Sequence, residues 1–220
     1  MKKIALPLLL LCLLACNAPA PVNTTPTITR NTTSTAAHSV PSQSFDYYLL
    51  NLSWSPEFCH SHQSAPECGR HATFVLHGLW PQNSDGSYPE KCNSAPGPAN
   101  PSQYSDIYPD PNLLEHEWRT HGTCSGLSPD EFFATARAAF QSFVVPPKLA
   151  QLNAQISLPP QEILSLVTES NRSIPSGSLA LSCGNNYLTA VEVCLDKQLH
   201  PIACGPVRSC RANTVRIPPP

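Results

Sequence analysis

The sequence predicts an α+β fold in which a central antiparallel β-sheet is flanked by helices. Two observations lead to this class. Strand and helix patterns follow one another without the regular βαβ alternation that a parallel sheet requires. Residues 44–217 also form one stretch of ordinary globular composition, which is long enough to bury a hydrophobic core of its own. We therefore expect one folded domain over this range.

Three segments have the composition of β-strands, and the second of them places His77 near its end. The third alternates apolar and polar residues, and we expect a hairpin between Cys194 and Cys204 after it. These segments are residues 45–54, 72–80 and 186–195.

Three other segments predict helices, and the middle one has the clearest signals. Ser128 and Glu131 form a capping box around Pro129, and phenylalanines and alanines follow at helical spacing. The three helices are expected at residues 112–121, from Pro129 to the Pro146-Pro147 pair, and at 161–170. Residues 83–103 are rich in turn formers and predict a long surface loop that Cys92 ties down.

The first 43 residues predict an export signal and a tether. Residues 1–15 have two lysines followed by a short apolar run, which is typical of a lipoprotein-type signal peptide with Cys16 as the lipidation site. Residues 16–43 are rich in Pro, Thr and Ser and predict a disordered tether. The alternatives are a transmembrane anchor and ordinary cleavage after the Ala18-Pro19-Ala20 stretch. We expect a periplasmic or outer-membrane-anchored lipoprotein of a bacterium or, alternatively, a secreted protein.

Eight cysteines lie in the domain, and an even number in an exported chain predicts four disulfides. Their spacing leaves many pairings open. They are Cys59, Cys68, Cys92, Cys124, Cys183, Cys194, Cys204 and Cys210.

The charge of the domain limits the ways in which it can bind a partner. Ten Lys and Arg residues stand against fifteen Asp and Glu residues, so the net charge is −5 with neutral histidines. This balance excludes nucleic-acid binding through a broad basic surface. Seven histidines make the domain more positive on acidification. An anionic substrate is therefore expected to bind through few contacts, and better at acidic pH.

The stretch HEWRTHGTC, residues 116–124, gathers ionisable side chains. Its histidines, His116 and His121, are five residues apart, one more than in the helical zinc signature His-Glu-x-x-His. On an ideal helix this spacing turns the imidazoles about 140° apart, too far for simple chelation of one metal ion. Glu117 and His121 share a helix face. His77 is a further candidate, since an imidazole has few structural reasons to lie in an apolar strand.

Three histidines and a carboxylate, without a nucleophilic serine or cysteine, predict paired acid and base catalysis. Cys124 is a poor nucleophile candidate because it is expected to form a disulfide. The natural reaction of two imidazoles is cleavage of a phosphodiester beside a hydroxyl. One imidazole takes the hydroxyl proton and the other protonates the leaving oxygen, while cationic groups stabilise the transition state.

The segments FVLHGLWPQ (residues 74–82) and HEWRTHGTC resemble the two active-site segments of the ribonuclease T2 family, which usually read HGLWP and HEWxKHGTC. The similarity extends from about residue 45 to 210. It implies a T2-like α+β fold and a metal-independent endoribonuclease without a cofactor, expected to be a monomer. Its partner would be single-stranded RNA and not DNA, which lacks the 2′-hydroxyl. The membrane would be contacted only through the lipid anchor.

The resemblance also implies roles for matching residues. His121 would be the general base for the ribose 2′-hydroxyl, and His77 the general acid for the 5′-oxygen. The product would be a 2′,3′-cyclic phosphate, which is then hydrolysed to a 3′-phosphate. His116 would hold the phosphate, and Glu117 would polarise it. The implied disulfides are Cys59–Cys68, Cys92–Cys124, Cys183–Cys210 and Cys194–Cys204.

Base binding is the part of the site for which the resemblance implies stacking. Trp80 and Tyr88 match positions that sandwich a base. Gln82 stands where some family members carry a base-reading aspartate, so we assign it to the base site and expect low base specificity.

Thr120 is a departure from the family pattern, which has a lysine there that holds transition-state charge. Arg119 precedes it but would point about 100° away around the helix. Both are candidates for transition-state support. We expect Thr120 to donate only a hydrogen bond and the enzyme to remain active, at a lower rate.

Two other functions are left open. A zinc hydrolase is suggested by the opening cluster and by a second group with the look of metal ligands, although loop histidines around a short disulfide explain this group more simply. The second group is Cys59, His60, His62, Cys68 and His71. The departure at Thr120 alone suggests a catalytically weakened ribonuclease-like binding module on the cell envelope.

Overall fold

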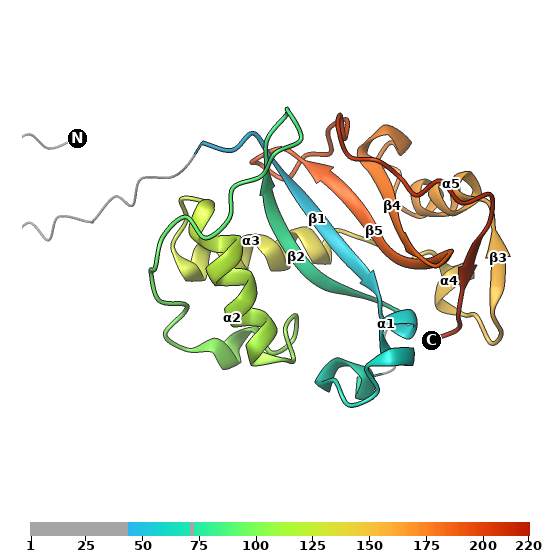
Figure 1. The fold of residues 1–220 in the computed structure, drawn as a ribbon, viewed down its shortest axis with the longest axis horizontal. Coiled ribbons are helices and arrows are strands. Elements are labelled where there is room, and N and C mark those ends of the chain that lie inside the picture. Colours follow the sequence, from blue (N-terminus) through green and yellow to red (C-terminus); the bar gives the residue numbers. More distant parts are fainter. Residues whose placement is uncertain (1–43, 71–72) are drawn as a thin grey trace, which may run out of the picture. The chain divides into compact units, whose positions relative to one another are not determined.

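The computed structural model describes residues 44–70 and 73–220, so the predicted signal peptide, the predicted tether and Cys16 lie outside the described residues. A six-stranded sheet runs in the order β2-β1-β5-β6-β3, and β4 pairs with β5. Its pairings are antiparallel except for one parallel contact between β5 and β6. This confirms the α+β prediction (Figure 1). The strands are β1 (Tyr47–Trp54), β2 (Phe74–Gln82), β3 (Ile156–Leu158), β4 (Leu179–Gly184), β5 (Tyr187–Leu195) and β6 (Val215–Ile217).

The three predicted helices are confirmed to within about a residue at most ends. The α3 capping box forms as expected: the Glu131 N–H donates to Ser128 Oγ at 3.4 Å and the Ser128 N–H donates to Glu131 Oε2 at 2.9 Å. Asp110 caps α2 by accepting a bond from the Asn112 N–H at 2.8 Å. The helices are α1 (Ser55–Ser61), α2 (Pro111–Thr120), α3 (Pro129–Gln141), α4 (Pro147–Ala150) and α5 (Pro160–Ser170), with α1 and α4 not foreseen.

The main core lies on one face of the central strand β1. Leu50, Leu52 and Trp54 are almost wholly buried there, and they share a cluster with the α3 phenylalanines Phe132 and Phe133. Because side chains alternate along a strand, the residues between them face the other side of the sheet. Residues 49, 51 and 53 therefore carry the face on which the site described below is built.

The hairpin that contains β5 differs from the prediction. The partner of β5 is β4, a strand that the sequence did not suggest, and Asn185 and Asn186 join the two. Both have positive φ angles, 50° and 63°, as a two-residue hairpin turn of type I′ requires. Between Cys194 and Cys204 the chain does turn back on itself: Leu195 and Pro201 form an isolated antiparallel bridge, and the Ile202 N–H donates to the Cys194 carbonyl at 2.9 Å. The predicted hairpin is therefore present only as a short turn closed by the disulfide, without a second regular strand.

All four implied disulfides are confirmed. The Cys92–Cys124 bond ties the long loop of residues 83–103 to the chain just after α2, as expected from its turn-rich sequence. In the part of the chain that the structure describes, no helix is long and apolar enough to span a bilayer.

Candidate active site

His77 lies in the middle of β2, and the prediction that it stands near the strand end is wrong. The register pairs Asn51 with Gly78 and Leu52 with Leu76, so His77 is the additional residue of a β-bulge. A bulge locally bends the strand and re-aims the side chains around it, and such bulges are common beside active sites.

The bulge brings His77 and Trp80 to the same face of the sheet. They are three residues apart, and strict alternation would place them on opposite faces. Instead, Leu76 and Leu79 are buried in the core while His77 and Trp80 are half-buried. The two rings contact edge to face with centroids 5.2 Å apart.

The second motif lies where α2 ends. Thr120 is its last residue, and His121 follows as the C-cap with φ −114° and ψ −47°. The His116 and His121 ring centroids are 6.4 Å apart. The expectation that the spacing keeps the two imidazoles too far apart to share one ion is therefore wrong, because His121 lies just past the last residue of α2 and its side chain turns toward His116. The spacing argument assumed a regular helix that includes His121, whereas α2 ends at Thr120.

This arrangement reopens the question of a metal ion. One donor atom each of His116, Glu117 and His121 lie within 4.8 Å of one another, close enough to serve one ion, so metal independence stays a prediction. The other suggested zinc group is different. Cys59 and Cys68 are joined in a disulfide, which removes both thiolates, and His71 lies outside the described residues.

Glu117 is the buried acid at the centre of the site. It is 0% exposed, and its Oε2 accepts a hydrogen bond of 2.9 Å from the Trp80 indole. Its Oε1 has no hydrogen-bond partner among the described residues and lies 3.9 Å from His77 Nε2. Burial raises the pKa of Glu117 to about 8. At neutral pH the side chain is therefore mainly a carboxylic acid, which can donate a hydrogen bond to a phosphoryl oxygen.

The two imidazoles assigned to proton transfer favour their neutral forms. Burial, followed by repulsion from His116, lowers the pKa of His77. Burial, followed by His116 and then His77, lowers the pKa of His121 to about 4. The Ser53 hydroxyl lies 3.3 Å from His77 Nδ1 and holds the ring on the sheet side. His121 stacks on Trp80 with centroids 5.2 Å apart.

The residues assigned to base binding line one cleft of about 460 Å³. Tyr88 is 57% exposed, so its ring is accessible to a base. The Gln82 amide donates to the carbonyl of its neighbour Pro81 at 3.0 Å. His77 does not line this cleft. Its ring contacts Trp80, which does line it, and its Nε2 lies 3.9 Å from Glu117 Oε1. The lining residues are Leu49, Trp80, Gln82, Tyr88, Glu90, Lys91, His116, Thr120 and His121.

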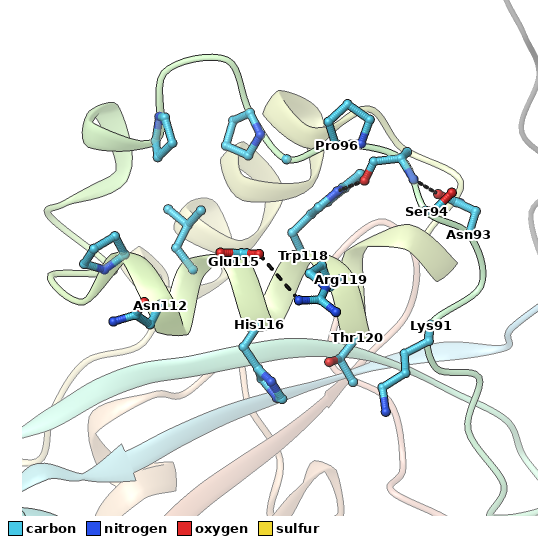
Figure 2. A pocket seen from close by; sticks show the side chains of 16 residues that line it. Lys91, Asn93, Ser94, Pro96, Asn112, Glu115, His116, Trp118, Arg119 and Thr120 are labelled. Carbon is cyan, nitrogen blue, oxygen red and sulfur yellow. Dashed lines mark hydrogen bonds and ion pairs between the residues drawn. The ribbon is translucent and has the colours of Figure 1, made fainter.

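A second cleft, of about 920 Å³, lies between α2 and the loop that follows Lys91 (Figure 2). Arg119 is on its wall, strongly exposed, with a guanidinium nitrogen 3.5 Å from Glu115 Oε1. Thr120 is buried at 6% exposure. Figure 2 shows Arg119 turned toward Glu115, whereas His116 and Thr120 project from the lower side of the helix in this view. Of the two candidates for transition-state support, Arg119 is thus paired with Glu115.

Gly78 is a site residue to which sequence analysis gave no role. A Cβ atom at this position would collide with Glu117 Oε2 and with Trp80 Nε1. The glycine therefore lets the Trp80–Glu117 hydrogen bond lie directly against β2. Its place between His77 and Leu79 in the HGLWP segment was the only signal, because a requirement for space appears only once the partners are folded together.

Comparison with known proteins identifies the family to which the chain belongs. The model of the ribonuclease T2 family matches residues 45–204. The chain is 43% identical over 122 residues to a ribonuclease of Aeromonas hydrophila, covering 53% of this chain and 56% of that protein. It is 30% identical over 190 residues to ribonuclease DdI of Dictyostelium discoideum, covering 77% of this chain and 82% of that protein.

Solved structures show the same fold. The RNase-related protein from Calystegia sepium has a TM-score of 0.67 at 23% identity, covering 80% of this chain and 98% of that one. RNase NT, solved in complex with 5′-AMP, has a TM-score of 0.63 at 22% identity, covering 81% and 99%. From the family match and the sequence identities, the chain belongs to the ribonuclease T2 family of endoribonucleases.

Proposed function

We propose that this chain cleaves single-stranded RNA by transesterification, without a metal or other cofactor, and with low base specificity. The observation that carries the proposal is the meeting of two imidazoles from different elements around one buried acid. His77 comes from the bulge of β2 and His121 from the end of α2. The carboxylate of Glu117, on α2, lies 3.9 Å from His77 Nε2 and has a donor atom within 4.8 Å of one of His121, and its pKa is raised to about 8.

The first step is an internal displacement at phosphorus. Neutral His121 takes the proton of the ribose 2′-hydroxyl, and the O2′ atom forms a bond to phosphorus. The bond from phosphorus to O5′ breaks, and protonated His77 gives its proton to O5′. His116 and the protonated Glu117 donate hydrogen bonds to the non-bridging oxygens, where negative charge grows. The product is a 2′,3′-cyclic phosphate.

The second step reverses these roles with water in place of the leaving alcohol. His77, now neutral, takes a proton from water, whose oxygen bonds to phosphorus. The bond to O2′ breaks, and protonated His121 returns a proton to O2′. A 3′-phosphate results, and both imidazoles regain their starting states.

Substrate binding relies on stacking more than on charge. Trp80, Gln82 and Tyr88 share the cleft, and the accessible Tyr88 ring accepts any base face. The Gln82 amide is engaged with its own neighbour, which supports a weak base preference. DNA is spared because the reaction needs the 2′-hydroxyl.

Four disulfides support the proposal that the domain, which we expect to be a monomer, works outside the cytoplasm after export. Lipidation at Cys16 would anchor it to a membrane of the envelope. Mass spectrometry of the mature N-terminus distinguishes this from ordinary cleavage and release.

The decisive test uses a DNA oligonucleotide that contains one ribonucleotide. Wild type should cut once, after the ribose, and give a terminal 2′,3′-cyclic phosphate that mass spectrometry detects. His121→Ala should not cut, whereas His200→Ala should cut as wild type does, because His200 is exposed and pairs with Asp196. Cleavage should continue in excess EDTA. Tight binding of RNA without any product would instead indicate a binding module, and loss of cleavage in EDTA would indicate a metal enzyme.

A further inference from the structure

Lys91 is held beside the end of α2 although it comes from the long loop after β2. Its backbone N–H donates a hydrogen bond of 2.8 Å to the carbonyl of Thr120. The next residue is fixed to the same turn, because the Cys92 N–H donates to Thr123 Oγ1 at 3.2 Å and Cys92 forms a disulfide with Cys124. These bonds set the position of Lys91 relative to the second motif.

The Lys91 side chain faces the site, and its amine is unpaired within the described part of the chain. Lys91 lines both clefts described above, and so do His116 and Thr120. Figure 2 shows the Lys91, Thr120 and His116 side chains projecting on the same side of α2. The Lys91 amine forms no hydrogen bond or ion pair with another described residue, including its neighbour Glu90, which also lines the cleft.

Lys91 is the only lysine or arginine among the nine described residues that line this cleft. Arg119 lines the other cleft and is paired with Glu115. The low pKa of His121 leaves that imidazole neutral in the resting enzyme. A phosphoryl group gains negative charge on its non-bridging oxygens as the O2′ atom attacks, and a nearby cation stabilises that charge.

We propose that Lys91 supplies the cation that stabilises the reacting phosphoryl group, next to the uncharged Thr120. The proposal rests on the ribonuclease function proposed above. Lys91 contacts a non-bridging oxygen beside His116, and the contact is stronger in the transition state than in the bound substrate because the charge is larger there. The backbone hydrogen bond from Lys91 to Thr120 thus brings a loop lysine beside the helix position that is occupied by threonine.

The experiment measures turnover of a dinucleoside 3′,5′-monophosphate, whose single phosphate is the reacting one. General attraction of a long RNA to the lysine then plays no part. Lys91→Gln should lower kcat by roughly 10- to 100-fold with a smaller change in KM, a range typical of a hydrogen bond to a charged group. Lys91→Arg should stay within about 5-fold of wild type, since it keeps the charge. The control Lys148→Gln should not change the rate, because Lys148, on α4, pairs with Glu162 of α5 and lines neither cleft.

A rescue experiment separates this role from a structural one. Thr120→Lys should restore most of the lost rate in the Lys91→Gln background, and change wild type by less than about 3-fold. Lys91→Gly provides a second variant without the side chain, because φ is 51° at this position and glycine adopts that conformation freely.

The possible results distinguish failure of the Lys91 proposal from failure of the proposed ribonuclease function. Equal turnover of the dinucleotide by wild type and Lys91→Gln overturns the proposal, even if long RNA is cut more slowly. An equal loss in Lys91→Arg and Lys91→Gln also overturns it, provided thermal unfolding shows both variants folded. If wild type itself cleaves no ribonucleotide, the proposed function fails instead, so the two failures are distinguishable.

Discussion

The Trp80 indole donates a hydrogen bond of 2.9 Å to Glu117 Oε2, which joins two motifs 37 residues apart in the sequence. Trp80 comes from the strand with His77, and Glu117 from the helix with His116. The bond lies on Gly78, where a Cβ would prevent it. It therefore fixes the distance between the acid and base sides of the site.

Replacing Glu117 should separate its hydrogen-bonding role from its bulk. Glu117→Gln keeps an acceptor for Trp80 and a donor for the phosphate, so we expect a loss in kcat of less than about 10-fold. Glu117→Ala leaves the indole N–H unpaired and opens a cavity, so it should destabilise the fold by about 1–3 kcal/mol and reduce kcat much further. Urea unfolding and dinucleotide turnover check both. Equal activity of the two variants would contradict this role.

The raised pKa of Glu117 also predicts a pH dependence of stability. The folded pKa is about 8 and that of an unperturbed glutamate is 4.5, so between these pH values the folded state holds a proton that the unfolded state has lost. The contribution of Glu117 to stability is full below pH 4.5 and is lost as pH rises through about 8. Relative to Glu117→Gln, wild type should lose about 3–5 kcal/mol of unfolding free energy across this window. A constant difference from pH 5 to 9 in urea titrations would rule this out.

Gly78→Ala should damage the site through space alone. The added methyl group meets Glu117 and Trp80, so one of them must move, and we expect destabilisation of about 1–3 kcal/mol together with a marked loss of turnover. Gly177→Ala is the matched control, because a Cβ there meets nothing within 4 Å. Thermal unfolding and initial rates check the pair, and an active, stable Gly78→Ala would show that the hydrogen bond is dispensable.

Ser53→Ala should affect the acid side of the reaction. When His77 is protonated, its Nδ1–H donates to the Ser53 hydroxyl and Nε2 is directed toward Glu117. Without the hydroxyl the pKa of His77 should fall further, so the alkaline limb of the rate profile moves to lower pH and turnover at pH 7 drops several-fold. Ser165→Ala, exposed on α5, is the control. An unchanged profile would show that Ser53 does not position the ring.

The wild-type rate should have an acidic optimum. The base His121 is neutral above a pKa of about 4, and the acid His77 is protonated below a pKa that burial holds under the usual 6.5. The profile of kcat/KM, which reports the free enzyme, should therefore be a bell whose maximum lies between these values. Initial rates on the dinucleotide check this, and a flat profile from about pH 4 to 9 would contradict it.

Much of the fold was predictable because its signals are local. The capping box at Ser128 fixes the start of α3 through neighbouring residues only, and the turn-rich loop of residues 83–103 is read in the same way. The β4–β5 hairpin was missed because its turn is made by Asn185 and Asn186 with positive φ angles. An asparagine pair alone does not predict this turn, because the same pair also occurs in other conformations. The His116–His121 distance was misjudged because the exact residue at which a helix ends is set by its surroundings.

The sequence by itself determined which chemical groups are present: three histidines and a glutamate in two motifs, four disulfides and no broad basic surface. Only the tertiary structure decided how they act. The β-bulge turns His77 to the face of Trp80, burial keeps Glu117 protonated and His121 neutral, and one backbone bond carries Lys91 to Thr120. Residue type and capping are properties of short segments, whereas register, desolvation and contacts between distant segments arise only when the chain packs against itself.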